Sequence, residues 1–181
     1  MPNIEIELTS VDFVTIGTIG PKGQRVFYLQ AGQETRIVSM VIEKEQSWAL
    51  SEAIRELIDD LDQRYDAETE AEINLVDMDM DLREPIEPVF RVSQMGLGYD
   101  EDRDLIVLVA QEFVPTQLDR DENDIDEDTF DLESDESVSP GVVRMWCSRE
   151  QMRALSMQAL DTVQSGRVNP KQNGRLVYYW T

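Results

Sequence analysis

The sequence predicts an α+β fold in which two β-β-β-α units form an antiparallel sheet, with two helices packed on it. Three observations lead to this prediction. Short segments with alternating apolar and polar residues are typical of half-buried strands. Two longer segments carry apolar residues at the spacing of one helix face. A string at one strand–helix junction, residues 38–51, recurs at a second junction, residues 143–156.

The first half of the chain is expected to contain four strands and one helix. Isoleucine and leucine alternate with glutamate over residues 4–8, which indicates a strand with one exposed face. A glycine-bearing hairpin turn that includes Gly20, Gly23 and Arg25, and a second turn at residues 32–34, separate the strands that follow. These strands are expected at residues 13–19, 25–31 and 36–42. The apolar spacing then changes to 3 and 4, which predicts an amphipathic helix over residues 44–65.

The second half shows the same order of predicted elements. Residues 90–99 and 105–113 are expected to form a hairpin, and residues 142–147 a further strand. Ser148 and Gln151 have the spacing of a capping box, which predicts the start of a second helix.

The two junctions align without gaps, and seven of the fourteen positions are identical. Each copy is a strand that leads into a helix, preceded by a hairpin that begins at a phenylalanine (Phe13 and Phe90). Duplication explains this pattern better than chance identity. We therefore expect one domain, two repeat units and one acidic insert, at residues 1–181, 11–66, 90–166 and 117–140.

Charge and composition exclude several classes of function. The chain has 16 basic and 38 acidic residues and a formal net charge of −22, so it lacks the basic surface that binds nucleic acid directly. It has no histidine and one cysteine, which excludes His-based triads, zinc sites of Cys and His, and a disulfide within the chain. No membrane-spanning run or signal-peptide pattern is present. We expect a cytoplasmic protein that binds neither cofactors nor membranes.

Several strings resemble those of an uncharacterised bacterial family, which is described as a conserved repeat protein with a domain of unknown function. They include residues 13–20, 23–31 and 43–46, and the resemblance covers roughly residues 11–174. Members of that family often carry a zinc-ribbon-like segment with two cysteine pairs near the C-terminus. Here residues 166–174 contain no cysteine. The resemblance therefore implies a member without this metal segment, and it implies no activity.

The strand–helix junctions contain the first candidates for a binding site. A lysine, carboxylates and an amide come together at a helix start, where free N–H groups can hold an anion. Alternatively, these side chains cap the helix and form local ion pairs, because glutamate is favourable in a first helical turn. The candidates are Glu43, Lys44, Glu45 and Gln46, with Arg149 and Gln151 in the second copy.

A metal site is a weaker hypothesis. Asp77, Asp79 and Asp81 would share one side of an extended segment, where three carboxylates could bind Mg²⁺ or Ca²⁺. The alternative is an edge strand that its charges keep unpaired. Cys147 ends an apolar strand, so we expect a buried structural thiol.

Two further segments could bind a partner. Residues 119–136 contain eleven acidic side chains and one arginine, which is typical of a solvated loop and could also attract a basic protein. Tyr178, Tyr179 and Trp180 are aromatic residues of the kind that anchors interfaces, although they could equally pack on the sheet of their own chain.

These patterns favour a non-enzymatic protein-binding or regulatory module, with a basic protein as one possible partner. An alternative is a Mg²⁺-dependent enzyme acting on a phosphorylated or nucleotide substrate, with the three aspartates, Glu43 and Lys44 as the available residues. A third hypothesis is a nucleic-acid mimic that occupies a basic groove. The oligomeric state stays open.

Overall fold

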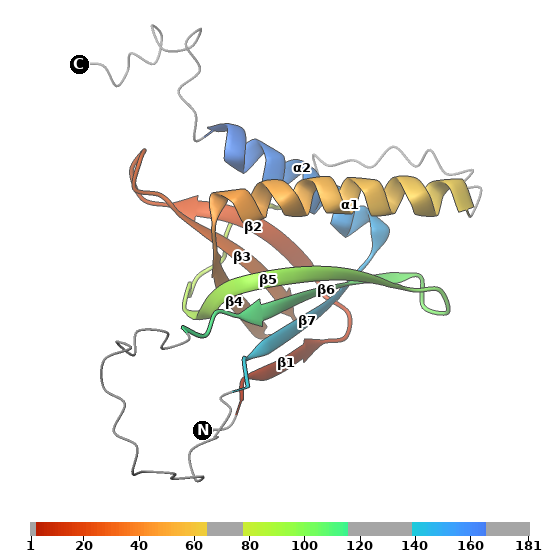
Figure 1. Cartoon of the computed structure of the whole chain (residues 1–181), viewed down its shortest axis with the longest axis horizontal. Helices are drawn as coiled ribbons and strands as arrows, with labels where there is room; N and C mark the ends of the chain where they lie inside the picture. Colours follow the sequence, from red (N-terminus) through yellow and green to blue (C-terminus); the bar gives the residue numbers. More distant parts are fainter. Residues whose placement is uncertain (1–2, 65–77, 116–138, 166–181) are drawn as a thin grey trace, which may run out of the picture.

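A computed structural model describes residues 3–64, 78–115 and 139–165, which form a seven-stranded sheet with two helices on the same face (Figure 1). The strands are β1 (Glu5–Leu8), β2 (Phe13–Ile19), β3 (Val26–Gln33), β4 (Arg36–Ile42), β5 (Pro88–Asp100), β6 (Leu105–Glu112) and β7 (Val142–Cys147). The helices are α1 (Lys44–Arg64) and α2 (Arg149–Ser165). The predicted α+β class is confirmed.

The strand order in the sheet is β1-β7-β6-β5-β4-β3-β2. Most neighbours are antiparallel, as predicted, but β1 runs parallel to β7 and β4 runs parallel to β5. The sheet is therefore mixed, which corrects the expectation of a wholly antiparallel sheet. The reason is that α1 carries the chain from the end of β4 back to the start of β5, and such a helical crossover makes the two strands parallel.

The sheet curls because β1 and β2 lie at its opposite ends although residues 9–12 alone separate them. Within this short link, the Val11 N–H donates to Trp146 O of β7 at 3.0 Å, and the Asp12 N–H donates to Gly32 O of β3 at 2.7 Å. One continuous segment thus joins both ends of the sheet.

The two halves have the same order of elements and matching contacts. In the cross-strand register, the buried residues Ile16, Leu29 and Met40 correspond to Leu97, Leu108 and Met145. The helices meet at a reciprocal pair of hydrogen bonds: Ser51 Oγ donates to Ser156 O at 2.9 Å, and Ser156 Oγ donates to Ser51 O at 3.0 Å. The halves are therefore related by an approximate two-fold axis near these serines. Duplication as their origin stays a prediction.

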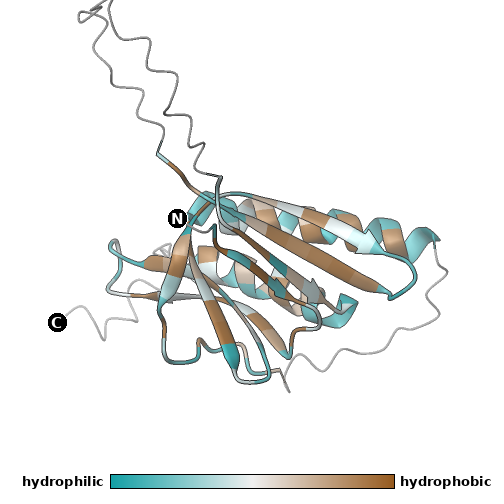
Figure 2. Cartoon of the chain, turned by 90° about the horizontal axis from the view of Figure 1, so that it is seen from below, coloured by the Kyte–Doolittle hydropathy of each residue, from teal (hydrophilic) through white to brown (hydrophobic). Residues whose placement is uncertain are grey.

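Apolar side chains of the sheet face those of α1 and α2, and Figure 2 shows apolar residues along the strands and on parts of both helices. Residues 78–87 form an irregular segment without a strand, and this segment covers part of the other side of β2 and β3. Buried Gln30 holds this segment, because it donates to Arg83 O at 2.8 Å and accepts from the Arg83 N–H at 2.7 Å.

Strand β3 continues through Gly32, where the sequence predicted a turn. Gly32 is needed for space rather than for a turn, because a Cβ atom there would lie 2.2 Å from Cε1 of Phe13. The turn instead lies at Glu34, whose φ of 56° is in the left-handed region.

Candidate functional site

The repeated glutamines tie each helix start to the backbone of the other half. Gln46 accepts the Glu43 N–H at 2.7 Å and donates to Val92 O at 3.0 Å. Gln151 accepts the Ser148 N–H at 2.8 Å and donates to Val11 O at 2.8 Å. Both amides thus cap a helix and bond to a backbone carbonyl. The neighbouring charged side chains are therefore more available than the amides to bind a ligand.

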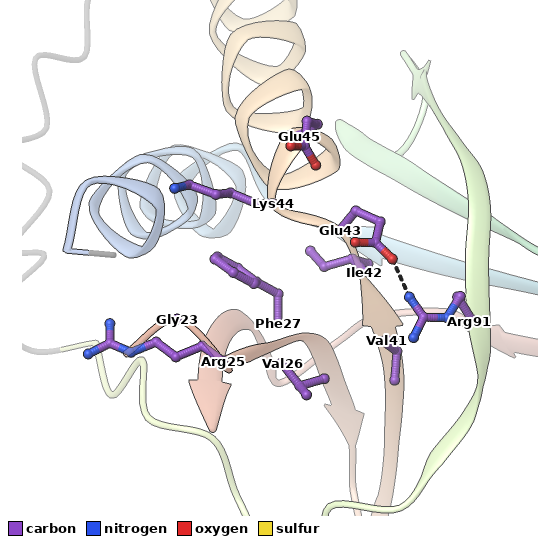
Figure 3. Close-up of a pocket in the computed structure, with 10 residues that line it drawn as sticks. All are labelled: Gly23, Arg25, Val26, Phe27, Val41, Ile42, Glu43, Lys44, Glu45 and Arg91. Carbon is purple, nitrogen blue, oxygen red and sulfur yellow. Dashed lines mark hydrogen bonds and ion pairs between the residues drawn. The ribbon is translucent and has the colours of Figure 1, made fainter. Parts of the chain in front are cut away.

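A pocket of about 390 Å³ lies beside the start of α1 (Figure 3). Strands β3 and β4 supply its apolar floor, which includes the buried residues Phe27 and Ile42. Three basic side chains line it, from β5, from α1 and from the residue before β3. They are Arg91, Lys44 and Arg25.

The basic residues of this pocket differ in whether a carboxylate pairs with them. Arg91 forms an ion pair with Glu43 at one end. Arg25 donates to the neutral Ser165 O at 3.4 Å, at the end of α2. Within the described part of the chain, no ion pair between Lys44 and a carboxylate is present. Figure 3 shows Arg25 and Lys44 pointing toward the same end of the pocket, with the Phe27 ring between them.

The equivalent position in the second half is closed by an ion-pair network. Arg149 corresponds to Lys44 in the repeat. It donates to Asp104 Oδ1 at 2.8 Å and to Tyr99 OH at 3.2 Å, and it lies 3.8 Å from Asp62. Desolvation and the hydrogen bond to Asp104 raise the pKa of Tyr99. A protein carboxylate therefore already neutralises the second-copy cation.

A second hollow of about 250 Å³ forms a groove between α1 and β5, lined by Ala49, Leu50 and Ala53 of α1 and by residues 93–97 of β5. Strand β5 pairs with β4 only up to Arg91. Among the described residues, the stretch from residue 94 to residue 100 pairs with β6 alone, and no described strand lies along its other edge.

The corresponding edge of β2 is covered by α2. Gln158 Nε2 of α2 donates to Ile16 O at 3.1 Å. At the matching edge of β5, Leu97 corresponds to Ile16 in the register, and Ala53 of α1 occupies the helix position that matches Gln158. Alanine carries no donor, so the edge at Leu97 receives no such bond from α1.

The metal hypothesis gains no support from the described residues. Asp77 lies outside them, and Asp79 Oδ1 accepts the Asp81 N–H at 3.0 Å, which turns this carboxylate toward its own backbone. In the described ranges, no three Asp, Glu, Cys or His residues gather as a metal would require. The acidic insert's core at residues 119–136 and the aromatic residues 178–180 also lie outside the described ranges.

Cys147 is fully buried, and burial raises the pKa of its thiol from 9.0 to about 12. The folded chain keeps this proton while the unfolded chain loses it above pH 9.0, so this contribution to stability should fall as the pH rises from 9.0 toward 12. We expect a loss of about 1.4 kcal/mol per pH unit relative to Cys147→Val, measured by denaturant unfolding. The same pH dependence in both chains would contradict a buried, protonated thiol.

The sequence matches one protein family over residues 6–172. The chain belongs to the DUF3090 family, whose members are proteins of unknown function. No curated protein and no solved structure matches it. The DUF3090 match includes both halves, the pocket and the groove, and confirms the resemblance to a family with a domain of unknown function. The proposed loss of a zinc-ribbon-like segment concerns residues beyond α2, outside the described ranges.

Sequence reasoning found Glu43, Lys44 and Glu45 of the DUF3090 pocket but missed Arg25 and Arg91. Arg25 was assigned to a hairpin turn, and nothing near Arg91 in sequence indicates a site. The signal that could have drawn attention to these residues is the scarcity of basic side chains, since 3 of the chain's 16 lysines and arginines line this pocket.

In the described part of the chain, no helix is long and apolar enough to cross a membrane.

Proposed function

We propose that this DUF3090 chain is a non-enzymatic binding module that holds an extended segment of a protein partner along the free edge of β5. The observation that carries the proposal is the edge at residues 94–100, which no other described strand pairs with and which lies beside an apolar groove of about 250 Å³ under α1. An exposed edge offers a row of backbone N–H and C=O groups, and an added strand satisfies them.

The groove has room for the side chains of such a strand. Ala49 and Ala53 are short and exposed on α1, and a Cβ atom at Gly96 would meet nothing within 4 Å. Leu97 of β5 matches Ile16 of β2 in the cross-strand register. Because Ile16 O lies at the outer edge of β2, the backbone groups of Leu97 lie at the matching edge of β5. Met95 and Leu97 are only partly buried and would contact apolar residues of the partner.

The charge around the groove defines the chemistry of the partner. Glu56 lies on α1 about one turn beyond Ala53, and Asp100 ends the open stretch of β5. A strand in which apolar and basic side chains alternate could place its apolar side chains in the groove and its basic side chains near these carboxylates. The partner segment is therefore expected to be basic. The Mg²⁺-dependent alternative has no comparable observation in its favour.

Ala53→Gln is expected to weaken this binding about tenfold, because the longer polar side chain would occupy the groove that Ala53 lines. The probe is a ten-residue peptide of alternating valine and lysine, titrated into the full chain. Its valine–glutamate counterpart should bind at least tenfold more weakly. Hydrogen exchange should show that the lysine peptide protects the Leu97 amide.

Arg55→Gln is the matched control, since it places the same side chain on the opposite side of α1, where Arg55 is exposed. It should leave peptide affinity unchanged. Equal binding of both peptides, no protection at Leu97, or unchanged affinity in Ala53→Gln would each contradict the proposal.

A further inference from the structure

The pocket beside α1 differs from its second-half counterpart in the sign of one charge. In the strand register, Arg25 occupies the position that Asp104 occupies in the second half. Asp104 neutralises Arg149 at 2.8 Å. Lys44, the equivalent of Arg149, therefore has a cation at the position where its counterpart has a carboxylate.

Two cations at one end of a pocket repel each other unless an anion lies between them. The chain has 38 acidic residues, yet the two carboxylates that line this pocket do not neutralise that end. Glu43 is paired with Arg91, and Figure 3 shows Glu45 above the pocket, on the side away from Arg25. The positive end of the α1 dipole adds to the same potential.

We propose that this pocket binds a small phosphate monoester that carries an apolar or aromatic group. Among the described residues, neither Arg25 nor Lys44 has a carboxylate partner. A phosphate monoester carries close to two negative charges at neutral pH, which matches these two cations better than the single charge of a carboxylate does. Arg25 offers a planar fork of donors and Lys44 a mobile ammonium group, and both are suited to phosphate oxygens.

The rest of the pocket suits the organic part of such a ligand. The Phe27 ring lies between the two cationic side chains, and Val26 is 39% exposed beside it. Burial of a ring against these residues would add apolar contact to the charge pairing. This site is separate from the groove along β5, so either proposal can fail without the other.

Phenyl phosphate is the probe, with inorganic phosphate and benzoate as comparisons, in calorimetric titrations of the full chain. Phenyl phosphate should bind at least tenfold more tightly than benzoate, and more tightly than inorganic phosphate. Arg25→Asp recreates the charge arrangement of the second half, so it should weaken phenyl phosphate binding at least tenfold. The thermal midpoint of the free protein should not fall, because the new carboxylate can pair with Lys44.

Arg36→Asp makes the same charge change at an exposed position at the other end of the β3–β4 hairpin, and it should not alter affinity. Lys44→Gln is a second variant that tests the same site if Arg25→Asp does not fold. The absence of phenyl phosphate binding, equal binding of benzoate, or undiminished binding in both site variants would overturn the proposal.

Discussion

Leu108→Ala is expected to lower the free energy of unfolding by about 2–5 kcal/mol. Leu108 is fully buried on β6, between Leu97 of β5 and Met145 of β7 in the register. Truncation removes apolar contacts and leaves a cavity that a paired central strand cannot close. Denaturant unfolding with an unchanged m-value would measure this loss.

Leu29→Ala is the matched variant in the first half, since Leu29 is equally buried between Ile16 and Met40. We expect the two losses to agree within about 2 kcal/mol, the spread of Leu→Ala losses between buried sites. Ile19→Ala, at a residue that is 44% exposed, should cost clearly less. A Leu108→Ala loss no larger than that of Ile19→Ala would contradict the described core.

Gln151→Ala is expected to cost about 2 kcal/mol, because it removes the partners of two partly buried backbone groups, Ser148 N–H and Val11 O. Gln151→Glu keeps the acceptor for Ser148 but loses the donor to Val11, so it separates the two contributions. Equilibrium unfolding of both variants provides the measurement.

Gln46→Ala, at the equivalent position, should cost less, because its bonds to the Glu43 N–H and Ser93 O are exposed to solvent. The losses in the double variant should add within about 0.5 kcal/mol, because the two glutamines share no partner. A Gln151→Ala loss below that of Gln46→Ala would contradict this account of the helix starts.

The two proposals rest on the same kind of comparison. In the second half, Asp104 neutralises Arg149, and in the first half Arg25 stands in that position. Gln158 covers the edge of β2, and Ala53 leaves the matching edge of β5 open. In each site, a first-half side chain (Arg25 or Ala53) leaves open what its second-half counterpart (Asp104 or Gln158) closes.

Several features could be predicted because neighbouring residues determine them. Alternating apolar residues predicted β2 and β7 with their observed bounds, and helical spacing predicted α1 to within one residue of its end at Arg64. The capping role of Gln151 followed from its distance to Ser148. The positions of these elements in the sheet did not follow, because strand pairing joins residues far apart in the chain.

The parallel pairing of β4 with β5 shows what local patterns lack. It depends on where α1 crosses the sheet and on how far β5 extends past Arg91, and neither is encoded near the paired residues. The same holds for Arg25 and Lys44, which are brought to one pocket by two different elements. Glycine 32 was misjudged for a related reason, because its need for space comes from the Phe13 ring on a neighbouring strand.

The sequence by itself determined the strands, the two helices, the capping glutamines and an acidic chain without histidine. These features depend on backbone preferences and contacts within a few residues. The tertiary structure decided the mixed sheet, the cationic pocket and the open edge of β5. The physical reason is that these features arise from contacts between distant segments, whose free energy depends on packing and charge that only the folded chain brings together.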